Sequence, residues 1–157
     1  MSLSRTRSPK LVSGVYRIIS EASHSTVRVH QHGKPIVLSH RYELLGVFEQ
    51  WELTEQEKGG FLIRSMGLTL GQVGAENDIM IINGGNPIAF IVDPLGDGLY
   101  TVKAPGDDGL YWNITQPPTR QHPEVNVKLG AGAVDGEFEP TQLWRFERLD
   151  DDSGAYF

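Results

Sequence analysis

Arg120 lies among three prolines, in the segment Pro117-Pro118-Thr119-Arg120-Gln121-His122-Pro123. Proline fixes φ at about −65° and biases the residue before it toward extended backbone. We therefore expect an extended, stiff and exposed loop, which is the shape that a serine protease accepts in its cleft. The guanidinium of Arg120 would pair with the aspartate of a trypsin-like S1 pocket, with Thr119 before it and Gln121 after it.

Three other basic residues are alternatives to Arg120 for the same role. Lys128 lies beside the glycine-rich stretch of 130–133, Arg41 lies in the segment HRYE at 40–43, and Arg28 flanks the turn of an early hairpin. Lys34 flanks the same turn, but the proline that follows it makes that peptide bond a poor protease site. The sequence alone leaves the choice among these positions open.

Metal and enzyme chemistry have weaker support. His30 and His32 would share one face of a strand, and His24 or His40 could supply a third ligand, but no fixed ligand spacing supports this, so a solvated strand end is the preferred interpretation. The segment GDDG at 106–109 lacks the later ligands of a calcium loop and is typical of a hairpin turn. No catalytic motif is present, so we expect no enzyme activity, no metal and no cofactor.

Sugar binding is the main alternative function. Asp107, Asp108, Tyr111, Trp112 and Asn113 combine carboxylates, aromatic rings and an amide within seven residues. Such groups stack on sugar rings and hydrogen bond to their hydroxyls. The other parts of the chain offer no second set of this kind, so any such site would be monovalent.

The composition limits the partners. The chain has 157 residues, a formal charge of −6, 14 scattered basic residues and no cysteine. A scattered basic content under a net negative charge disfavours nucleic acid and anionic membranes, and the lack of cysteine excludes disulfides and thiolate chemistry. No apolar run approaches a membrane span, and none follows the basic N-terminus as in a signal peptide. We expect a soluble, cytoplasmic monomer.

The elements that must position these residues are short strands. Eleven apolar runs, β-branched or aromatic, are separated by Gly, Pro, Asn and Asp, and they cover 15–19, 26–30, 35–39, 48–53, 61–65, 79–83, 87–92, 99–103, 110–114, 125–129 and 143–149. This pattern predicts an all-β fold. The segment EQEKGG at 55–60 is the one candidate for a helical turn, but Gly59 and Gly60 stop it. Residues 1–12 and 150–157 are predicted tails around a single domain at 13–149.

The runs repeat three times. Gly14, Gly60 and Gly98 each open a unit, and Trp51, Phe90 and Trp144 each close one. One unit alone cannot bury its apolar face, whereas three units around a pseudo-threefold axis can share a core. This predicts about twelve strands, with the three closing aromatics in the core. The third unit carries the longest insertions, at 117–124 and 130–141, where binding function is expected to concentrate.

The closing segment Gln142-Leu143-Trp144-Arg145-Phe146 resembles the Gln-x-Trp-x-Phe closer of ricin-B-like β-trefoils. Taken with the three units and the missing cysteines, residues 14–149 resemble the fungal β-trefoil serine-protease inhibitors of the cospin and cnispin group. The resemblance implies a β-trefoil that blocks a trypsin-like serine protease through one exposed loop. Because members of the group use different loops, it does not choose among the basic candidates.

The resemblance also leaves cysteine-protease inhibition open, because other fungal trefoils perform it through loops of small residues. The segments SEASHS at 20–25 and LLGV at 44–47 would be the loops in that case. Both are poorer in glycine than such a wedge requires, so this function ranks behind inhibition of a serine protease.

Overall fold

The computed structural model describes residues 8–29, 33–39, 46–83, 86–106, 109–132 and 136–149, and these fold as a β-trefoil. The first unit holds β1 (Gly14–Ser20), β2 (Val27–Arg28), β3 (Val37–Ser39) and β4 (Trp51–Glu55), and the second holds β5 (Phe61–Ser65), β6 (Leu68–Val73), β7 (Ile79–Ile82) and β8 (Ile91–Pro94). The third holds β9 (Tyr100–Lys103), β10 (Leu110–Asn113), β11 (Glu124–Asn126), β12 (Lys128–Ala131) and β13 (Trp144–Arg148). Short 3₁₀ turns lie at η1 (Gly46–Glu49), η2 (Ala75–Asn77) and η4 (Pro140–Gln142).

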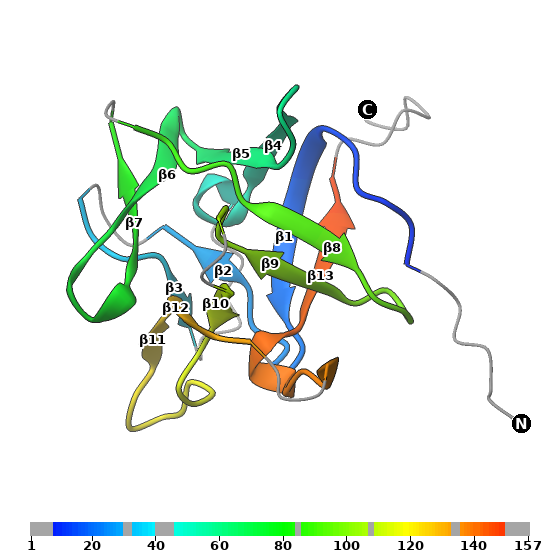
Figure 1. Cartoon of the computed structure of the whole chain (residues 1–157). Coiled ribbons are helices and arrows are strands. Elements are labelled where there is room, and N and C mark those ends of the chain that lie inside the picture. The colour runs from blue at the N-terminus through cyan, green and yellow to red at the C-terminus, as the bar shows by residue number, and fades with distance from the viewer. Residues whose placement is uncertain are drawn as a thin grey trace, which may run out of the picture.

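Six strands close into a barrel. In order around it, β1 pairs with β4, β4 with β5, β8 with β9, β9 with β13 and β13 with β1. The remaining contact is the bridge from Phe61 of β5 to Phe90, the residue directly before β8. Figure 1 shows β1, β9 and β13 close together, with β2 to their left and β3, β11 and β12 to their lower left. Closing the sheet removes its exposed edges, which would otherwise pair with other chains.

A ring of three backbone hydrogen bonds shows the pseudo-threefold symmetry directly. Ile36 N donates to Ile79 O at 2.9 Å, Ile79 N donates to Val127 O at 3.1 Å, and Val127 N donates to Ile36 O at 3.0 Å. Each residue comes from a different unit, and all three are fully buried. The ring ties the hairpins of the three units together across the symmetry axis.

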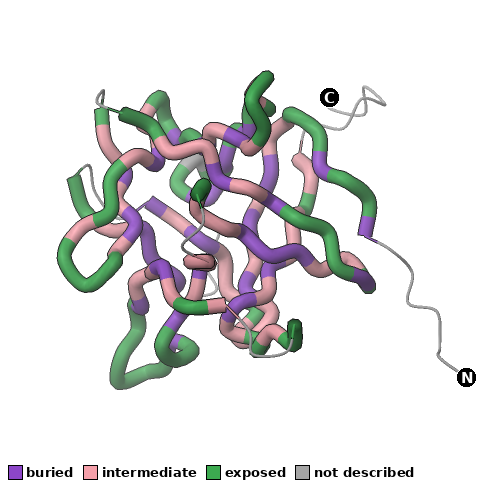
Figure 2. Tube along the Cα trace, in the orientation of Figure 1, coloured by how far each residue is buried: buried purple, intermediate pink, exposed green. Residues whose placement is uncertain are grey.

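The closing aromatics form the core, as the repeats predicted. Trp51, Phe90 and Trp144 are each 0% exposed. Figure 2 shows buried segments gathered in the interior of the molecule and exposed segments mainly in its outer loops. Trp112 joins the closing aromatics, with its ring edge-on to Phe90 at 5.4 Å and to Trp144 at 5.7 Å between centroids.

The N-terminal residues 8–12 pack against the barrel, which differs from the tail predicted over 1–12. Leu11 is buried, Ser8 Oγ donates to Leu99 O at 3.0 Å, and Tyr16 Oη donates to Val12 O at 2.8 Å. The hydroxyl of Tyr100 donates to Pro9 O. Polar composition suggested a free tail, but a serine hydroxyl can donate to a backbone carbonyl at the barrel rim, and backbone carbonyls of the segment can accept from tyrosine hydroxyls.

The segment at 55–60, where Gly59 and Gly60 were expected to stop a helical turn, forms a hairpin turn, in which Gly59 N donates to Gln56 O and Gln56 N donates to Gly60 O. One local prediction was wrong. The predicted strand at 125–129 is interrupted at Val127, because its N–H and C=O groups point into the symmetric ring. A strand residue cannot serve both the ladder and the ring with one donor and one acceptor.

Candidate functional site

The Arg120 loop, residues 115–123, connects β10 to β11 and projects from the lower edge of the molecule in Figure 1. Arg120 is exposed at its tip, whereas Pro118, two residues earlier, is buried. Within the described residues, Arg120 makes no ion pair or side-chain hydrogen bond. Its guanidinium therefore faces solvent, and buried Pro118 anchors the N-terminal side of the loop.

The tip of the loop is a closed turn, not the extended segment that the prolines suggested. Thr119 N donates to His122 O at 2.9 Å, and His122 N donates to Thr119 Oγ1 at 3.1 Å. Threonine side chains often compete in this way for backbone donors in turns. The prolines restrict their own φ and that of their predecessors, but they leave residues 119–122 free to bend.

The outgoing side of the loop is fixed by a second anchor. Arg28 Nη2 lies 2.8 Å from Glu124 Oε2, and Glu124 begins β11, where it pairs with Ser39 of β3. The Arg28 side chain is only 14% exposed. Arg28, itself a candidate for insertion into a protease, instead holds the base of the Arg120 loop.

Lys128 is also committed to a structural contact. Its Nζ lies 2.9 Å from Asp78 Oδ1 and 3.6 Å from Glu76 Oε2, across the junction between the second and third units. The carboxylate of Asp78 beside it raises the pKa of Lys128 above its usual 10.5, although partial burial opposes this. A protease could engage Lys128 only after these contacts broke.

Several predicted residues lie outside the described ranges, namely Arg41, His30, His32, His40, Asp107 and Asp108. His24 is described, and it occupies an exposed turn with φ of 57°. Among the described residues, no group of three His, Asp or Glu side chains is arranged to hold a metal ion. The same residues include no helix long and apolar enough to cross a membrane.

The predicted sugar site loses its stacking residue. Trp112 is 0% exposed and packs in the core, so it offers no ring face to a ligand. Tyr111 packs edge-on against Phe138, with ring centroids 4.9 Å apart. Asn113 does line a surface hollow of about 390 Å³, together with Thr141 and Gln142. Of the residues predicted for this site, Asn113 therefore lies at a surface hollow, whereas the ring of Trp112 is withdrawn into the core.

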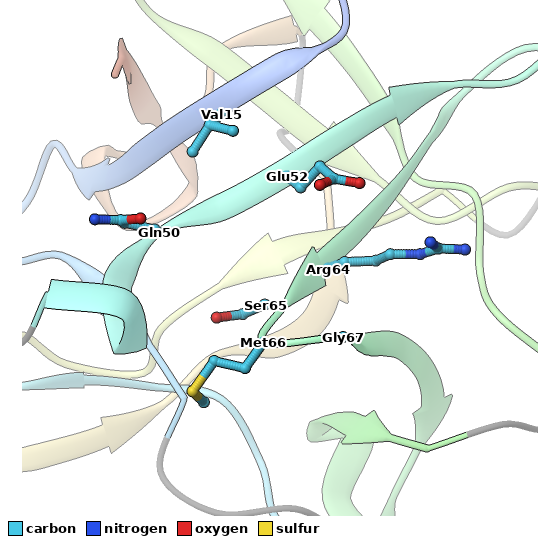
Figure 3. Close-up of a pocket in the computed structure, with 7 residues that line it drawn as sticks. All are labelled: Val15, Gln50, Glu52, Arg64, Ser65, Met66 and Gly67. Atoms are coloured by element: carbon cyan, nitrogen blue, oxygen red, sulfur yellow. The ribbon is translucent and has the colours of Figure 1, made fainter. Parts of the chain in front are cut away.

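Another hollow, of about 290 Å³, lies over β1, β4 and the β5–β6 turn. Figure 3 shows the guanidinium of Arg64 and the thioether of Met66 pointing in opposite directions. Glu52 and Arg64 are directly opposite in the strand register but form no ion pair within the described residues. These groups do not converge on one point, so the hollow lacks the geometry of a catalytic site.

The structure also reveals surface features that the sequence reasoning did not name. Leu95, Leu99, Phe138 and Leu143 line a hollow of about 600 Å³ beside the segment 136–143. The length of the insertion at 130–141 was the signal for this region, but the apolar partners come from the distant turn between β8 and β9. The spacing of residues along the sequence could not predict that this insertion packs beside the turn between β8 and β9.

Comparisons with known proteins support the fold. No family model matches the chain, and no curated protein matches it. Among solved structures, a proteinase inhibitor from Coprinopsis cinerea is similar with a TM-score of 0.69 and 13% identity, over 89% of this chain and 100% of the inhibitor. A ricin B-like lectin from Macrolepiota procera, in complex with lactose, has a TM-score of 0.68 and 17% identity, over 90% of this chain and 100% of the lectin.

A mosquitocidal holotoxin is also similar, with a TM-score of 0.72 and 14% identity over 90% of this chain. The chain spans only 18% of the holotoxin chain, so the likeness concerns one part of that protein. At these identities the likenesses establish the β-trefoil fold, and they include both an inhibitor and a lectin. The function must therefore be argued from the surface of this chain.

Proposed function

We propose that this chain is a non-enzymatic inhibitor of a trypsin-like serine protease and that the Arg120 loop enters the protease cleft. The observation that carries this proposal is the state of the basic candidates in the described residues. Arg28 and Lys128 are held in ion pairs at 2.8 and 2.9 Å, whereas the exposed guanidinium of Arg120 has no such partner. The fold shared with a proteinase inhibitor is consistent with this role.

The loop anchors favour tight binding, and the closed turn opposes it. Buried Pro118 on one side and the Arg28–Glu124 ion pair on the other limit the backbone freedom that docking would remove. Substrate-like docking needs an extended strand, so the two hydrogen bonds between Thr119 and His122 must open. Each such bond in an exposed turn contributes about 1 kcal/mol or less, which a filled S1 pocket can offset.

The first experiment measures inhibition of trypsin, chymotrypsin and papain by the purified chain and its variants. Arg120→Glu should abolish trypsin inhibition, since it places like charge against the S1 aspartate. Arg120→Leu should shift the preference toward chymotrypsin, whose S1 pocket is apolar. Lys58→Glu, at an exposed position in the turn between β4 and β5, makes the same charge change away from the loop and should inhibit like the unmodified chain.

Full trypsin inhibition by Arg120→Glu would contradict this site and move the search to Arg41, which lies outside the described residues. Inhibition of papain alone would instead support the cysteine-protease alternative. Its loop at 20–25 forms a tight turn, in which Ser20 N donates to Ser25 O at 2.8 Å, and this presents little backbone for wedging into a cleft.

Carbohydrate binding is the second candidate function. It is favoured by the hollow lined by Asn113, Thr141 and Gln142, whose amide and hydroxyl groups suit sugar hydroxyls. It is weakened by burial of Trp112, because sugar sites usually offer an aromatic face. A glycan array, followed by titration of any hit against Asn113→Ala, tests this function independently of the protease assays.

A further inference from the structure

Residues 136–141, the described end of the second insertion of the third unit, form a surface that the Arg120 loop does not use. The segment 136–143 lies between two hollows. One hollow, of about 600 Å³, is lined by Leu95, Leu99, Phe138 and Leu143, and the other, of about 390 Å³, is lined by Asn113, Glu139, Thr141 and Gln142. Glu137 lines both hollows, so we treat them as one two-part groove with an apolar half and a polar half.

The rim of the two-part groove is acidic. Glu137 and Glu139 line it, and Asp97 lies in the turn that carries Leu95 and Leu99; all three acids are exposed. No Lys or Arg of the described residues lines either half. The nearby Arg145 is already committed, because its Nη2 lies 3.0 Å from Glu21 Oε2 and its Nη1 donates to Asp97 O at 2.9 Å.

The walls of the groove are held by backbone and ring contacts. Leu95 N donates to Leu99 O at 2.9 Å, and Leu143 N donates to Pro140 O at 3.2 Å. Phe138 rests edge-on against Tyr111. Leu95 is nevertheless 41% exposed, so a turn with a fixed shape holds a large apolar side chain in water. Preformed hollows that expose apolar side chains beside polar groups are typical of binding surfaces.

We propose that the two-part groove binds an extended segment of another protein that carries an apolar residue close to a Lys or Arg. The apolar residue would fill the half lined by Leu95 and Phe138, and the cation would lie against Glu137 and Glu139. Charge complementarity selects this occupant over an acidic peptide, a nucleic acid or an anionic membrane. The proposal does not depend on inhibition through the Arg120 loop.

The test is an NMR titration of the full chain labelled with ¹⁵N. The probe is the peptide acetyl-Leu-Ser-Arg-Leu-amide, and acetyl-Leu-Ser-Glu-Leu-amide and lactose are the comparison ligands. We expect saturable shifts at the amides of 95–99 and 136–143 with the basic peptide. Binding of the acidic peptide should be about tenfold weaker, because attraction at the rim becomes repulsion.

Three variants sharpen the titration. Glu137→Lys should weaken the basic peptide about fivefold to tenfold, since it reverses the one charge shared by both halves. Phe138→Ala should weaken both peptides, whereas Glu57→Lys, at an exposed acid in a distant turn, should change neither affinity. Trypsin inhibition should be the same in Glu137→Lys as in the unmodified chain, which separates this groove from the Arg120 loop.

The proposal is overturned if the basic peptide gives no saturable shifts, or if the acidic peptide binds equally well. It is also overturned if lactose alone shifts these amides, since the groove would then be a sugar site. Absence of trypsin inhibition by the unmodified chain, with these titrations as expected, would refute the proposed function and leave the groove inference standing.

Discussion

The first and third units solve the same packing problem with different chain lengths. Trp51 Nε1 donates to Val27 O at 2.8 Å, and Trp144 Nε1 donates to Trp112 O at 3.4 Å. The two donors are separated from their acceptors by 24 and 32 residues, respectively. The third unit keeps this core contact, at a longer distance, despite its eight extra residues (32 − 24). Variation in length is therefore displaced to the loops, where the two binding proposals lie.

The residue two before each tryptophan shows a second difference. Gln142 is buried and its Nε2 donates to Ala131 O. Glu49 is 2% exposed and can only accept, so it receives a hydrogen bond from Thr26 Oγ1 at 2.9 Å and an ion pair from Arg17 Nε at 3.3 Å. The same position thus holds a donor in one unit and an acceptor in the other, and each unit supplies the complementary groups.

The largest expected effect tests whether the two tryptophans are equivalent. Trp51→Ala and Trp144→Ala should each lower the free energy of unfolding by about 3 to 5 kcal/mol, because each leaves a large cavity in a fully buried site. Denaturant unfolding followed by circular dichroism measures both losses. A loss below about 1 kcal/mol for either variant would mean that its unit does not share the common core.

Substitutions at the position two residues before each tryptophan, Glu49 and Gln142, should have an intermediate effect on the free energy of unfolding. Glu49→Ala should cost about 2 kcal/mol, since Thr26 and Arg17 lose a buried charged partner. Gln142→Glu should cost a similar amount, because it turns an acceptor toward the Ala131 carbonyl. Glu49→Gln should cost less than either, since an amide oxygen still accepts. If all three variants unfolded with the same free energy as the unmodified chain, the choice of donor or acceptor at this position would not affect stability.

The sequence predicted the parts of the fold that repeat. Glycine openings and aromatic closers located the three units, and the closers are the core residues Trp51, Phe90 and Trp144. It did not locate β6, because Gly71 interrupts the apolar pattern. A Cβ at Gly71 would lie 3.1 Å from both Asn86 O and Pro87 Cα, so a larger residue would crowd the neighbouring backbone, and the register between β6 and β7 shifts at this point.

The candidate site was less predictable, because it depends on contacts between distant residues. Arg28 and Lys128 are basic loop-flanking residues in the sequence, as Arg120 is. Only the pairing of β11 with β3 brings Glu124 to Arg28, and only the junction of two units brings Asp78 to Lys128. Trp112 was misassigned to a sugar site for a similar reason. Its type suits stacking, but alternation along β10 turns it into the core.

The smallest expected effect concerns the ion pair that joins the second and third units. Asp78→Asn should lower the free energy of unfolding by about 1 kcal/mol or less between pH 7 and 9. The pKa of Lys128 is raised in the folded chain, so its contribution is complete below the usual value of 10.5 and is lost as the pH rises through the raised value. The difference between the variant and the unmodified chain should therefore shrink above about pH 10.5.

Tyr100 titrates in the same alkaline range, and the comparison is designed to remove its effect. Burial, and to a smaller degree the charge of Tyr16, raises the pKa of Tyr100, so this group also loses its stabilising contribution as the pH rises. It does so in both proteins and cancels in the difference. The measurement is urea unfolding of both proteins from pH 7 to 11.5. If the difference in free energy of unfolding between the two proteins stays constant through the alkaline range, the charge on Lys128 does not stabilise the contact between the two units. If the difference falls to zero, the ion pair between Lys128 and Asp78 provides that stabilisation.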